Sequence, residues 1–423
     1  MVLATLLQSL YGIVDMVITG QYCGSAGLSG VSVGSNLMTM FSMIAVGLST
    51  GGNIVIGQYF GARDEKNRQE ATATTVAFLV ITGIGIAAIL FVLAKPILLL
   101  MQAPAMEEAM VYFRICAVGC IFIYGYNALC AVIRAVGNSK TPLYIILAAA
   151  LVNVGLDLLL IGVFRIGVAG AAIATVSSQL ISFLIALLYV LRKPELFGFR
   201  LNAVRISAEK LKLILKVGIP NALVFCINGI THSVNFSLVN TYGVAASAGC
   251  GSALKVIDIC IGFVTTNQNA SATMVAQCIG AGKYERVRQT FRACLLVGLA
   301  MSLILMAVMF FGARQLIGLF NGEPEVLELG AAYLRIIALQ AFTYIFFTSL
   351  NSVASGAGDA KIVMLNCILC MALPRILLAV TLNHLIGLNG MAWSNVLAPL
   401  VAIPIGLWYL LSEKYKHQLI RES

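Results

Sequence analysis

Three acidic residues, Asp15, Asp157 and Asp258, fall inside long apolar stretches of the chain. A carboxylate at the centre of a bilayer costs roughly 2.5–3.5 kcal/mol on insertion scales, so acids in such stretches need a reason to be there. Burial disfavours the charged form, so a buried carboxyl group can take up and release a proton near the ambient pH. Two carboxylates with nearby amide and hydroxyl oxygens can instead coordinate Na⁺. Acids of this kind therefore predict reversible binding of a proton or a cation, unless another interaction accounts for them.

Two of the acids lie on polar helical faces. Asp157 and Asn153 are four residues apart, so their side chains stack on one side of a helix. At spacings of 7, 3 and 4 residues, Asp15 shares its face with Gln8, Gly12 and Thr19. Hydrogen bonding between helices is the structural alternative for both acids, and we favour ion binding. Asp258 follows Lys255 by three residues, and there we favour an ion pair within one helix.

Other polar and aromatic side chains are candidates for a substrate cavity. Asn221, Asn228 and Asn235 recur at intervals of seven residues, which puts them on one face that lines a cavity or a helix interface. A histidine on this helix could titrate near neutrality, and an aromatic ring elsewhere could stack on a cationic ligand or pack in the core. The substrate-cavity candidates are Gln8, Tyr124, Asn228, Thr231, His232 and Asn235.

The composition indicates a membrane protein. Of 423 residues, 60% are hydrophobic and 10% are charged, whereas a soluble domain carries roughly 25% charged residues. A membrane-spanning helix needs about 20 apolar residues, and the chain divides into twelve such spans. Three apolar runs are too long for one crossing and must break near Cys23–Gly30, Tyr242–Gly243 and His384–Gly390. Met1 already lies in an apolar stretch, which predicts a very short tail or a shortened first helix.

The net charge of +10 comes mainly from basic residues in short loops that orient the chain in the membrane, and it does not indicate nucleic-acid binding. With the N-terminus inside, twenty Lys and Arg residues fall in cytoplasmic segments and three outside, at Lys95, Arg165 and Arg314. This bias predicts that both termini face the cytoplasm. We expect an N-terminal six-helix bundle at 1–191, a cytoplasmic linker at 192–213, a C-terminal six-helix bundle at 214–412 and a tail at 413–423.

The two predicted bundles are related by an internal repeat of about 220 residues. Four segments match in order, including Gln58-Tyr-Phe-Gly-Ala with Gln277-Cys-Ile-Gly-Ala and Ala135-Val-Gly with Gly356-Ala-Gly. Six helices per half make the halves parallel, an arrangement that places a substrate site between them. This favours a transporter that works by alternating access over a channel. The regions equivalent to the two acids of the first half, near Val234 and Leu377, carry no acid, which favours an ion site in the first bundle.

These motifs resemble the multidrug and toxic compound extrusion (MATE) family, along the whole chain. The resemblance rests on Gln8-Ser-Leu-Tyr-Gly-Ile-Val-Asp15, on the two Gln-x-x-Gly-Ala loops, and on Asn153-Val-Gly-Leu-Asp157 followed by Gly167-Val-Ala-Gly170. It implies efflux of organic, often cationic, compounds in exchange for H⁺ or Na⁺, with Asp15, Asn153 and Asp157 as the coupling residues. Some members carry an acid on the seventh and tenth helices. Here Asn228 stands on the seventh and the tenth has none, so the resemblance does not extend to a cation site in the second half.

Two other functions are weaker alternatives. A lipid-linked oligosaccharide flippase of the same superfamily would use a cationic cavity, and only Arg114, Arg335, Arg375 and the paired Lys255 are cations inside spans. A membrane-embedded enzyme would need a catalytic constellation, and no Ser–His pair at a useful spacing and no His-x-x-x-His motif occurs. We therefore expect no catalytic residues, no cofactor and no metal other than a Na⁺ at Asp15 and Asp157. We also expect a monomer in the cell (inner or plasma) membrane that handles small organic molecules and no nucleic acid.

Overall fold

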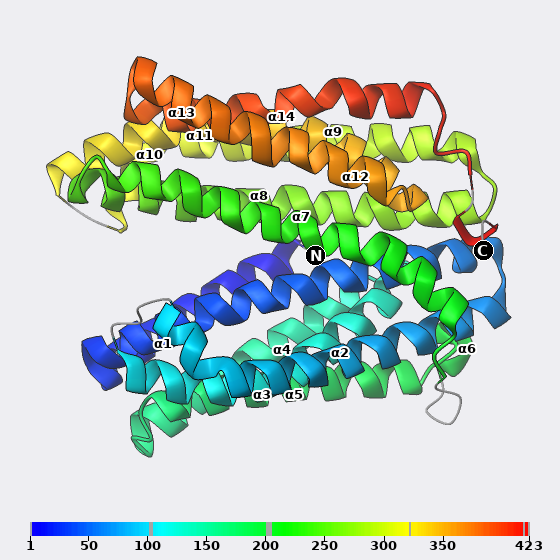
Figure 1. Ribbon diagram of the computed structural model, residues 1–423, viewed down its shortest axis with the longest axis horizontal. Helices are drawn as coiled ribbons and strands as arrows, with labels where there is room; N and C mark the ends of the chain where they lie inside the picture. Colours follow the sequence, from blue (N-terminus) through cyan, green and yellow to red (C-terminus); the bar gives the residue numbers. More distant parts are fainter. Residues whose placement is uncertain (1, 101–104, 200–204, 321–322, 418, 422–423) are drawn as a thin grey trace. The chain divides into compact units, whose positions relative to one another are not determined.

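The computed structural model describes residues 2–100, 105–199, 205–320, 323–417 and 419–421 (Figure 1). Side chains are not described at residues 2–17, Ser25, Ile230, His232, Ser233, Phe236, Asn240, Val244, Met371 and Arg421. Within the described residues the chain is helical and contains no strand. The helices are α1 (Val2–Ala62), α2 (Glu65–Leu100), α3 (Met106–Ala135), α4 (Lys140–Asp157), η1 (Leu158–Val163), α5 (Val168–Leu191), α6 (Pro194–Phe197), α7 (Ala208–Asn240), α8 (Val244–Gly280), α9 (Tyr284–Phe311), α10 (Ala313–Gly318), α11 (Pro324–Ala357), α12 (Ala360–Cys367), η3 (Ile368–Ala372), α13 (Leu373–Ile386), α14 (Leu388–Leu411) and η4 (Leu419–Arg421).

The helices account for the predicted membrane spans. Eleven helical segments of the described chain are long and apolar enough to cross a membrane. The part of α1 before its kink supplies the remaining predicted span. α1 is 61 residues long, or about 90 Å at 1.5 Å per residue, against a hydrocarbon core of about 30 Å. The helix is interrupted at Gly24, which has φ 67° and ψ −170°, a conformation that glycine adopts without a Cβ clash. The all-α fold with a break at Cys23–Gly30 is confirmed.

The other two predicted breaks are confirmed as well. The chain turns at Gly243, with φ 95°, between the end of α7 and the start of α8. It turns again at Gly387, with φ 63°, between α13 and α14. Both glycines lie in the part of φ/ψ space that side chains with a Cβ rarely enter.

The internal repeat is visible in the backbone. Positive φ angles recur about 220 residues apart, at equivalent turns of the two halves. The pairs are Gly24 with Gly243, Arg63 with Gly282, Gly137 with Gly358, and Gly167 with Gly387. A repeat that preserves turn geometry, and not only hydropathy, supports the predicted division into two similar six-helix halves.

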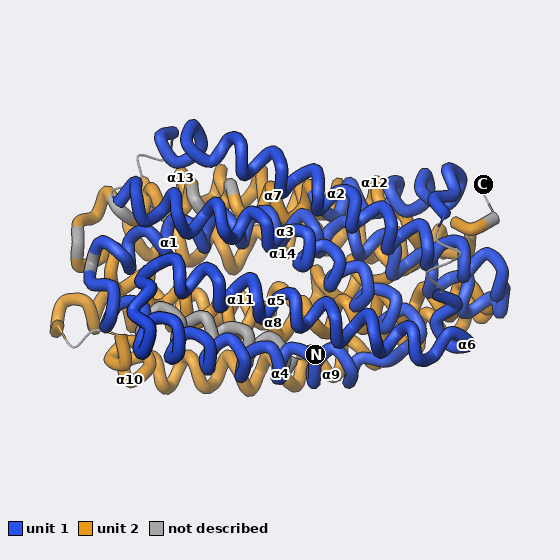
Figure 2. The backbone as a smooth tube through the Cα atoms, turned by 90° about the horizontal axis from the view of Figure 1, so that it is seen from below, with its two compact units in different colours: residues 1, 3–222 blue, residues 2, 223–423 orange. Residues whose placement is uncertain are grey.

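Contacts within the chain divide it into two compact units, residues 3–222 and 223–423 (Figure 2). In the first unit α3 is central and packs against α2 and α5, while α4 packs against α5. In the second unit α11 has the central place and packs against α8, α9 and α14. α3 and α11 are the repeat-equivalent fourth spans of the two halves, so each unit is built around the same helix.

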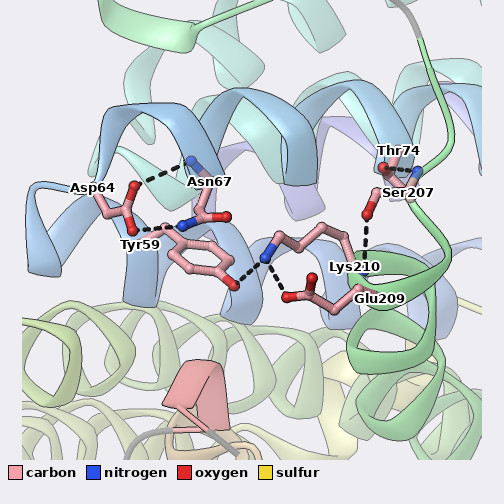
Figure 3. A network of polar contacts seen from close by, with 7 residues as sticks. All are labelled: Tyr59, Asp64, Asn67, Thr74, Ser207, Glu209 and Lys210. Carbon is pink, nitrogen blue, oxygen red and sulfur yellow. Dashed lines mark hydrogen bonds and ion pairs between the residues drawn. The ribbon is translucent and has the colours of Figure 1, made fainter. Parts of the chain in front are cut away.

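The boundary between the units falls inside α7, at residue 222. The first part of α7 packs on α1 through glycines: a Cβ at Gly51 would lie 2.2 Å from the carbonyl oxygen of Ile214. Lys210, which the sequence places in the cytoplasmic linker, is 3% exposed. Its ammonium group donates hydrogen bonds to Tyr59 Oη at 2.9 Å and to Glu209 Oε1 at 2.6 Å (Figure 3). The start of α7 is therefore anchored on the first unit.

The start of α2 is fixed by its own cap. The Asn67 side chain and backbone amide both donate to the Asp64 carboxylate, at 2.7 and 3.1 Å (Figure 3). These hydrogen bonds to the charged form lower the pKa of the Asp64 carboxyl group. An Asp at this position also interacts favourably with the positive end of the helix dipole.

α8 and α11 approach each other at two glycines. A Cβ at Gly330 would lie 2.9 Å from the Gly249 carbonyl oxygen, and a Cβ at Gly249 would lie 2.8 Å from the Gly330 nitrogen. Two buried serines of the same helices, Ser271 and Ser352, share a hydrogen bond of 2.8 Å. Small residues and hydroxyl pairs of this kind let helices associate in lipid, where no hydrophobic force drives them together.

Gly330→Val is expected to destabilise the second unit by about 1–3 kcal/mol, the usual cost of overpacking. The added side chain would force the backbones of α8 and α11 apart. Gly85→Val in α2 is the matched control, because no atom lies within 4 Å of a Cβ built there. The melting temperature of the purified protein in detergent measures the effect. Equal melting temperatures for the two variants would contradict the close packing at Gly330.

Candidate functional site

α4 carries the two predicted ion-binding residues that the structure describes. Its start is fixed by Asn138, whose side-chain oxygen accepts from the Thr141 amide at 3.1 Å while its nitrogen donates to Tyr189 Oη at 2.9 Å. Near the other end of the helix, Asn153 and Asp157 are 1% and 0% exposed. Their spacing places them on one buried face, as predicted, within an uncharged stretch of this span.

The helix changes geometry directly after Asp157. Residues Leu158–Val163 form a π-helix, and the Phe164 amide donates to the Leu159 carbonyl at 2.9 Å, five residues back. π-turns are rare and occur frequently at functional sites, because they widen the helix and shift the side chains around it. Asp157 therefore stands at the junction of two helical geometries, a feature that no sequence pattern indicated.

Buried polar groups gather on the neighbouring part of the first unit. The Oγ1 atom of Thr19 on α1 is buried without a hydrogen-bond partner in the described chain, and so are both polar side-chain atoms of Asn153. α1 lies beside η1, because a Cβ at Gly162 would be 3.6 Å from the ring of Tyr22. Unsatisfied buried polar atoms are costly, and ligand binding is one explanation for them. The side chains of Asp15 and Gln8 lie outside the described residues, although both belong to helical backbone.

The predicted polar face of α7 lies in the second unit. Thr231 and Asn235 are buried, at 1% and 6% exposed, and Asn228 is half-buried. The Thr231 hydroxyl donates to the Ile227 carbonyl at 2.9 Å and so is satisfied within its own helix. The Asn235 amide has no hydrogen-bond partner among the described residues and is the more available of the two. The His232 side chain is not described.

Tyr124 lies in the core of the first unit. Its ring is 0% exposed, and its hydroxyl donates to the Phe41 carbonyl at 3.0 Å. It also packs closely on α2, where a Cβ at Gly83 would lie 2.9 Å from its own Cβ. Tyr124 thus joins α3 to α1 and α2, and a contact with substrate stays a prediction.

The second unit holds a charged cluster that sequence reasoning described only in part. Asp258 on α8 lies within electrostatic range of Lys255, as expected, and also of Arg375 from α13. Arg375 is 5% exposed and is further surrounded by Tyr333 and Tyr344 of α11. The only sequence signal was a lone arginine after Pro374 in an apolar run. The cluster therefore links α8, α11 and α13 in addition to the predicted interaction of Lys255 with Asp258 within α8.

Comparison with known proteins shows what the chain as a whole is similar to. The MatE family model matches residues 1–159 and 220–381. "Probable multidrug resistance protein YpnP" of Bacillus subtilis is 31% identical over 371 residues, covering 86% of this chain and 82% of that protein. "Probable multidrug resistance protein NorM" of Thermotoga maritima is 25% identical over 98% of this chain and 90% of its own length.

Solved structures share the fold. An outward-facing multidrug resistance MATE family transporter of the MOP superfamily superimposes with a TM-score of 0.92 and 21% identity, covering 98% of this chain and 93% of its own. A mutant of the Vibrio cholerae MATE transporter VcmN gives 0.92 and 20% identity, over 99% of this chain and 96% of its own. At this identity the likeness shows the fold alone.

Proposed function

Because the chain belongs to the MatE family of multidrug efflux transporters, we propose that it exports organic, often cationic, compounds in exchange for H⁺ or Na⁺. It is a multi-pass membrane protein, and its relatives are bacterial transporters of small molecules, which points to the plasma membrane. Both termini face the cytoplasm in this proposal, in keeping with the distribution of Lys and Arg. The protein acts as a carrier and not as an enzyme.

The observation that supports ion coupling best is the burial of Asp157 and Asn153 on one face of α4, next to a π-turn. Placing a carboxyl group inside the membrane costs free energy, so such groups are rare there and usually serve a function. Protonation neutralises it, and Na⁺ binding compensates its charge with help from the Asn153 amide oxygen. Either event changes which conformation of the first unit is favoured, and this is what couples an ion gradient to transport.

We assign Asp15 to the same site as Asn153 and Asp157, because its backbone lies at a similar level along the membrane normal. Tyr22 of α1 lies beside Gly162, and in the predicted topology both segments lead outward from the cytoplasmic side. Asp15 comes seven residues before Tyr22, and Gly155 comes seven residues before Gly162. At about 1.5 Å per residue, the Asp15 backbone lies near the level of Gly155, between Asn153 and Asp157. In this proposal Asp15 joins Asp157 and Asn153 in one site for a proton or Na⁺.

The substrate site in this proposal includes the polar face of α7 in the second unit. Asn235 and Asn228 offer amide groups there, while the surrounding side chains are mainly apolar. A cavity with few charges binds through shape and dispersion, which suits varied organic compounds. The lipid-linked oligosaccharide flippase is not favoured, because the matched relatives carry multidrug resistance names.

The proposal is tested by efflux from bacteria that lack their own drug pumps. Cells that express the protein are expected to retain less ethidium than cells with an empty vector. A proton uncoupler in Na⁺-free buffer should abolish the difference if H⁺ is the coupling ion, and added Na⁺ should restore it if Na⁺ is. Ethidium retention equal to the empty vector, across a panel of organic cations and with the protein in the membrane, would contradict the proposed export.

A further inference from the structure

The first unit has a cavity that the transport mechanism does not use. It has a volume of about 390 Å³ and lies between the first turns of α2 and the segment that leads into α7. α2 contributes one helical face, and the other wall comes from Gly198 and Arg205–Ser207. The lining residues are Lys66, Gln69, Glu70, Ala73, Gly198, Arg205, Ile206 and Ser207. The volume is within the range of about 300–1,000 Å³ that small-molecule sites occupy.

The cavity has an excess of positive charge. Lys66 and Arg205 approach it from opposite walls, and both side chains are exposed. Neither has an ion-pair partner among the described residues. Among the described lining residues Glu70 is the one acid, and Gln69 adds a neutral hydrogen-bond donor. Two cations on opposite walls suit a group that carries negative charge on several oxygens, such as a phosphate.

The walls of the cavity are held in place by contacts within the unit. Thr74 of α2 donates to the Arg205 carbonyl at 3.4 Å and accepts from the Ser207 amide at 3.1 Å; Figure 3 shows the second contact. The Gly198 wall packs on α2, since a Cβ at this glycine would lie 2.5 Å from Gln69 Cγ. Both walls thus keep their spacing without a ligand, which lowers the ordering cost of binding.

The position of the cavity along the membrane normal favours a lipid head group over a soluble phosphate as its ligand. α2 begins at Glu65, at the cytoplasmic end of its span in the predicted orientation, where the phosphates of the inner leaflet lie. Basic pockets at this level bind the head groups of anionic lipids. We propose that this cavity binds the phosphate of an anionic lipid of the inner leaflet through Lys66 and Arg205. A bound lipid would link α2 to the start of α7.

Binding of short-chain phosphatidylglycerol to the purified full-length protein in detergent tests this. Lys66→Gln and Arg205→Gln are each expected to weaken the affinity about fivefold, and together about 25-fold, since each cation near a membrane surface contributes about 1 kcal/mol. Arg286→Gln removes an exposed arginine from the first turn of α9, the repeat-equivalent helix of the second unit. This matched variant should bind as the wild type does.

Glu70→Gln removes the acid from the cavity and should tighten binding of the lipid. Misfolding would weaken binding, so it cannot explain this result. Equal affinity for phosphatidylcholine, or a double variant within twofold of the wild type, would overturn the proposal. Glycerol 3-phosphate that binds as tightly as the lipid, with the same loss in the double variant, would assign the cavity to a soluble phosphate and overturn the lipid source.

Discussion

An Asp157→Asn variant is expected to reach the membrane at the wild-type level and to lose its ion-driven export. Asparagine keeps the shape of the side chain but can neither bind a proton nor compensate the charge of Na⁺. One-for-one exchange of H⁺ or Na⁺ for a monovalent organic cation moves no net charge, so the ion concentration gradient alone drives it: a tenfold ion gradient is about 1.4 kcal/mol and sustains about a tenfold substrate gradient. The variant should lose this gradient and retain only energetically downhill movement. Uptake of a radiolabelled organic cation into inverted vesicles, with an imposed proton or Na⁺ gradient, measures it.

Three variants separate coupling from folding. Asp15→Asn should give the same loss if Asp15 and Asp157 serve one site, and the double variant should be no worse than either alone. Counterflow, in which internal unlabelled substrate drives uptake of labelled substrate without an ion gradient, should survive in Asp157→Asn. Gradient-driven uptake at the wild-type rate in Asp157→Asn would show that this carboxyl group does not couple transport.

Much of the fold could be predicted from the sequence because the membrane leaves few choices. Every backbone polar group in lipid must be satisfied within the protein, so an apolar run of the right length is a helix. An apolar run that is too long for one crossing must be interrupted. The interruptions occur at glycines with positive φ, namely Gly24, Gly243 and Gly387. The pairing of Asn153 with Asp157 on a buried face was predictable for the same reason, since a helix fixes the direction of residues four apart.

What could not be predicted depends on contacts between segments far apart in the chain. The π-helix after Asp157 lies where η1 contacts α5 and Tyr22 of α1, and the sequence Leu158-Leu-Leu-Ile-Gly-Val163 would suit an ordinary α-helix equally well. The burial of Lys210 follows from Tyr59, a residue of another helix. A charge count places such a lysine in solvent, because it registers where cations occur and not what covers them.

The second expected result concerns the stability of variants in the charged cluster of the second unit, Lys255, Asp258 and Arg375. Asp258→Asn is expected to destabilise the protein, because it leaves the buried Arg375 guanidinium without the acid that compensates it. Arg375→Met in the same chain removes the charge that needed compensation. The double variant should therefore be more stable than the two single changes predict, with a coupling energy of about 0.5–1 kcal/mol, because the exposed Asp258 carboxylate is partly screened. Unfolding in detergent, followed by near-ultraviolet circular dichroism, measures all four proteins of the cycle.

A second double-variant cycle, with Lys255→Met in place of Arg375→Met, measures how strongly Asp258 is coupled to Lys255 compared with Arg375. If the ion pair within α8 were the main interaction, Lys255 would show the larger coupling to Asp258. Lys255 is exposed, however, and pairs three residues apart on a helix contribute only about 0.2–0.5 kcal/mol. Arg375 is buried on another helix, so its charge is less screened than that of Lys255, although Asp258 itself is exposed. A coupling of Asp258 to Lys255 that equals or exceeds its coupling to Arg375 would make the ion pair within α8 the main interaction of Asp258.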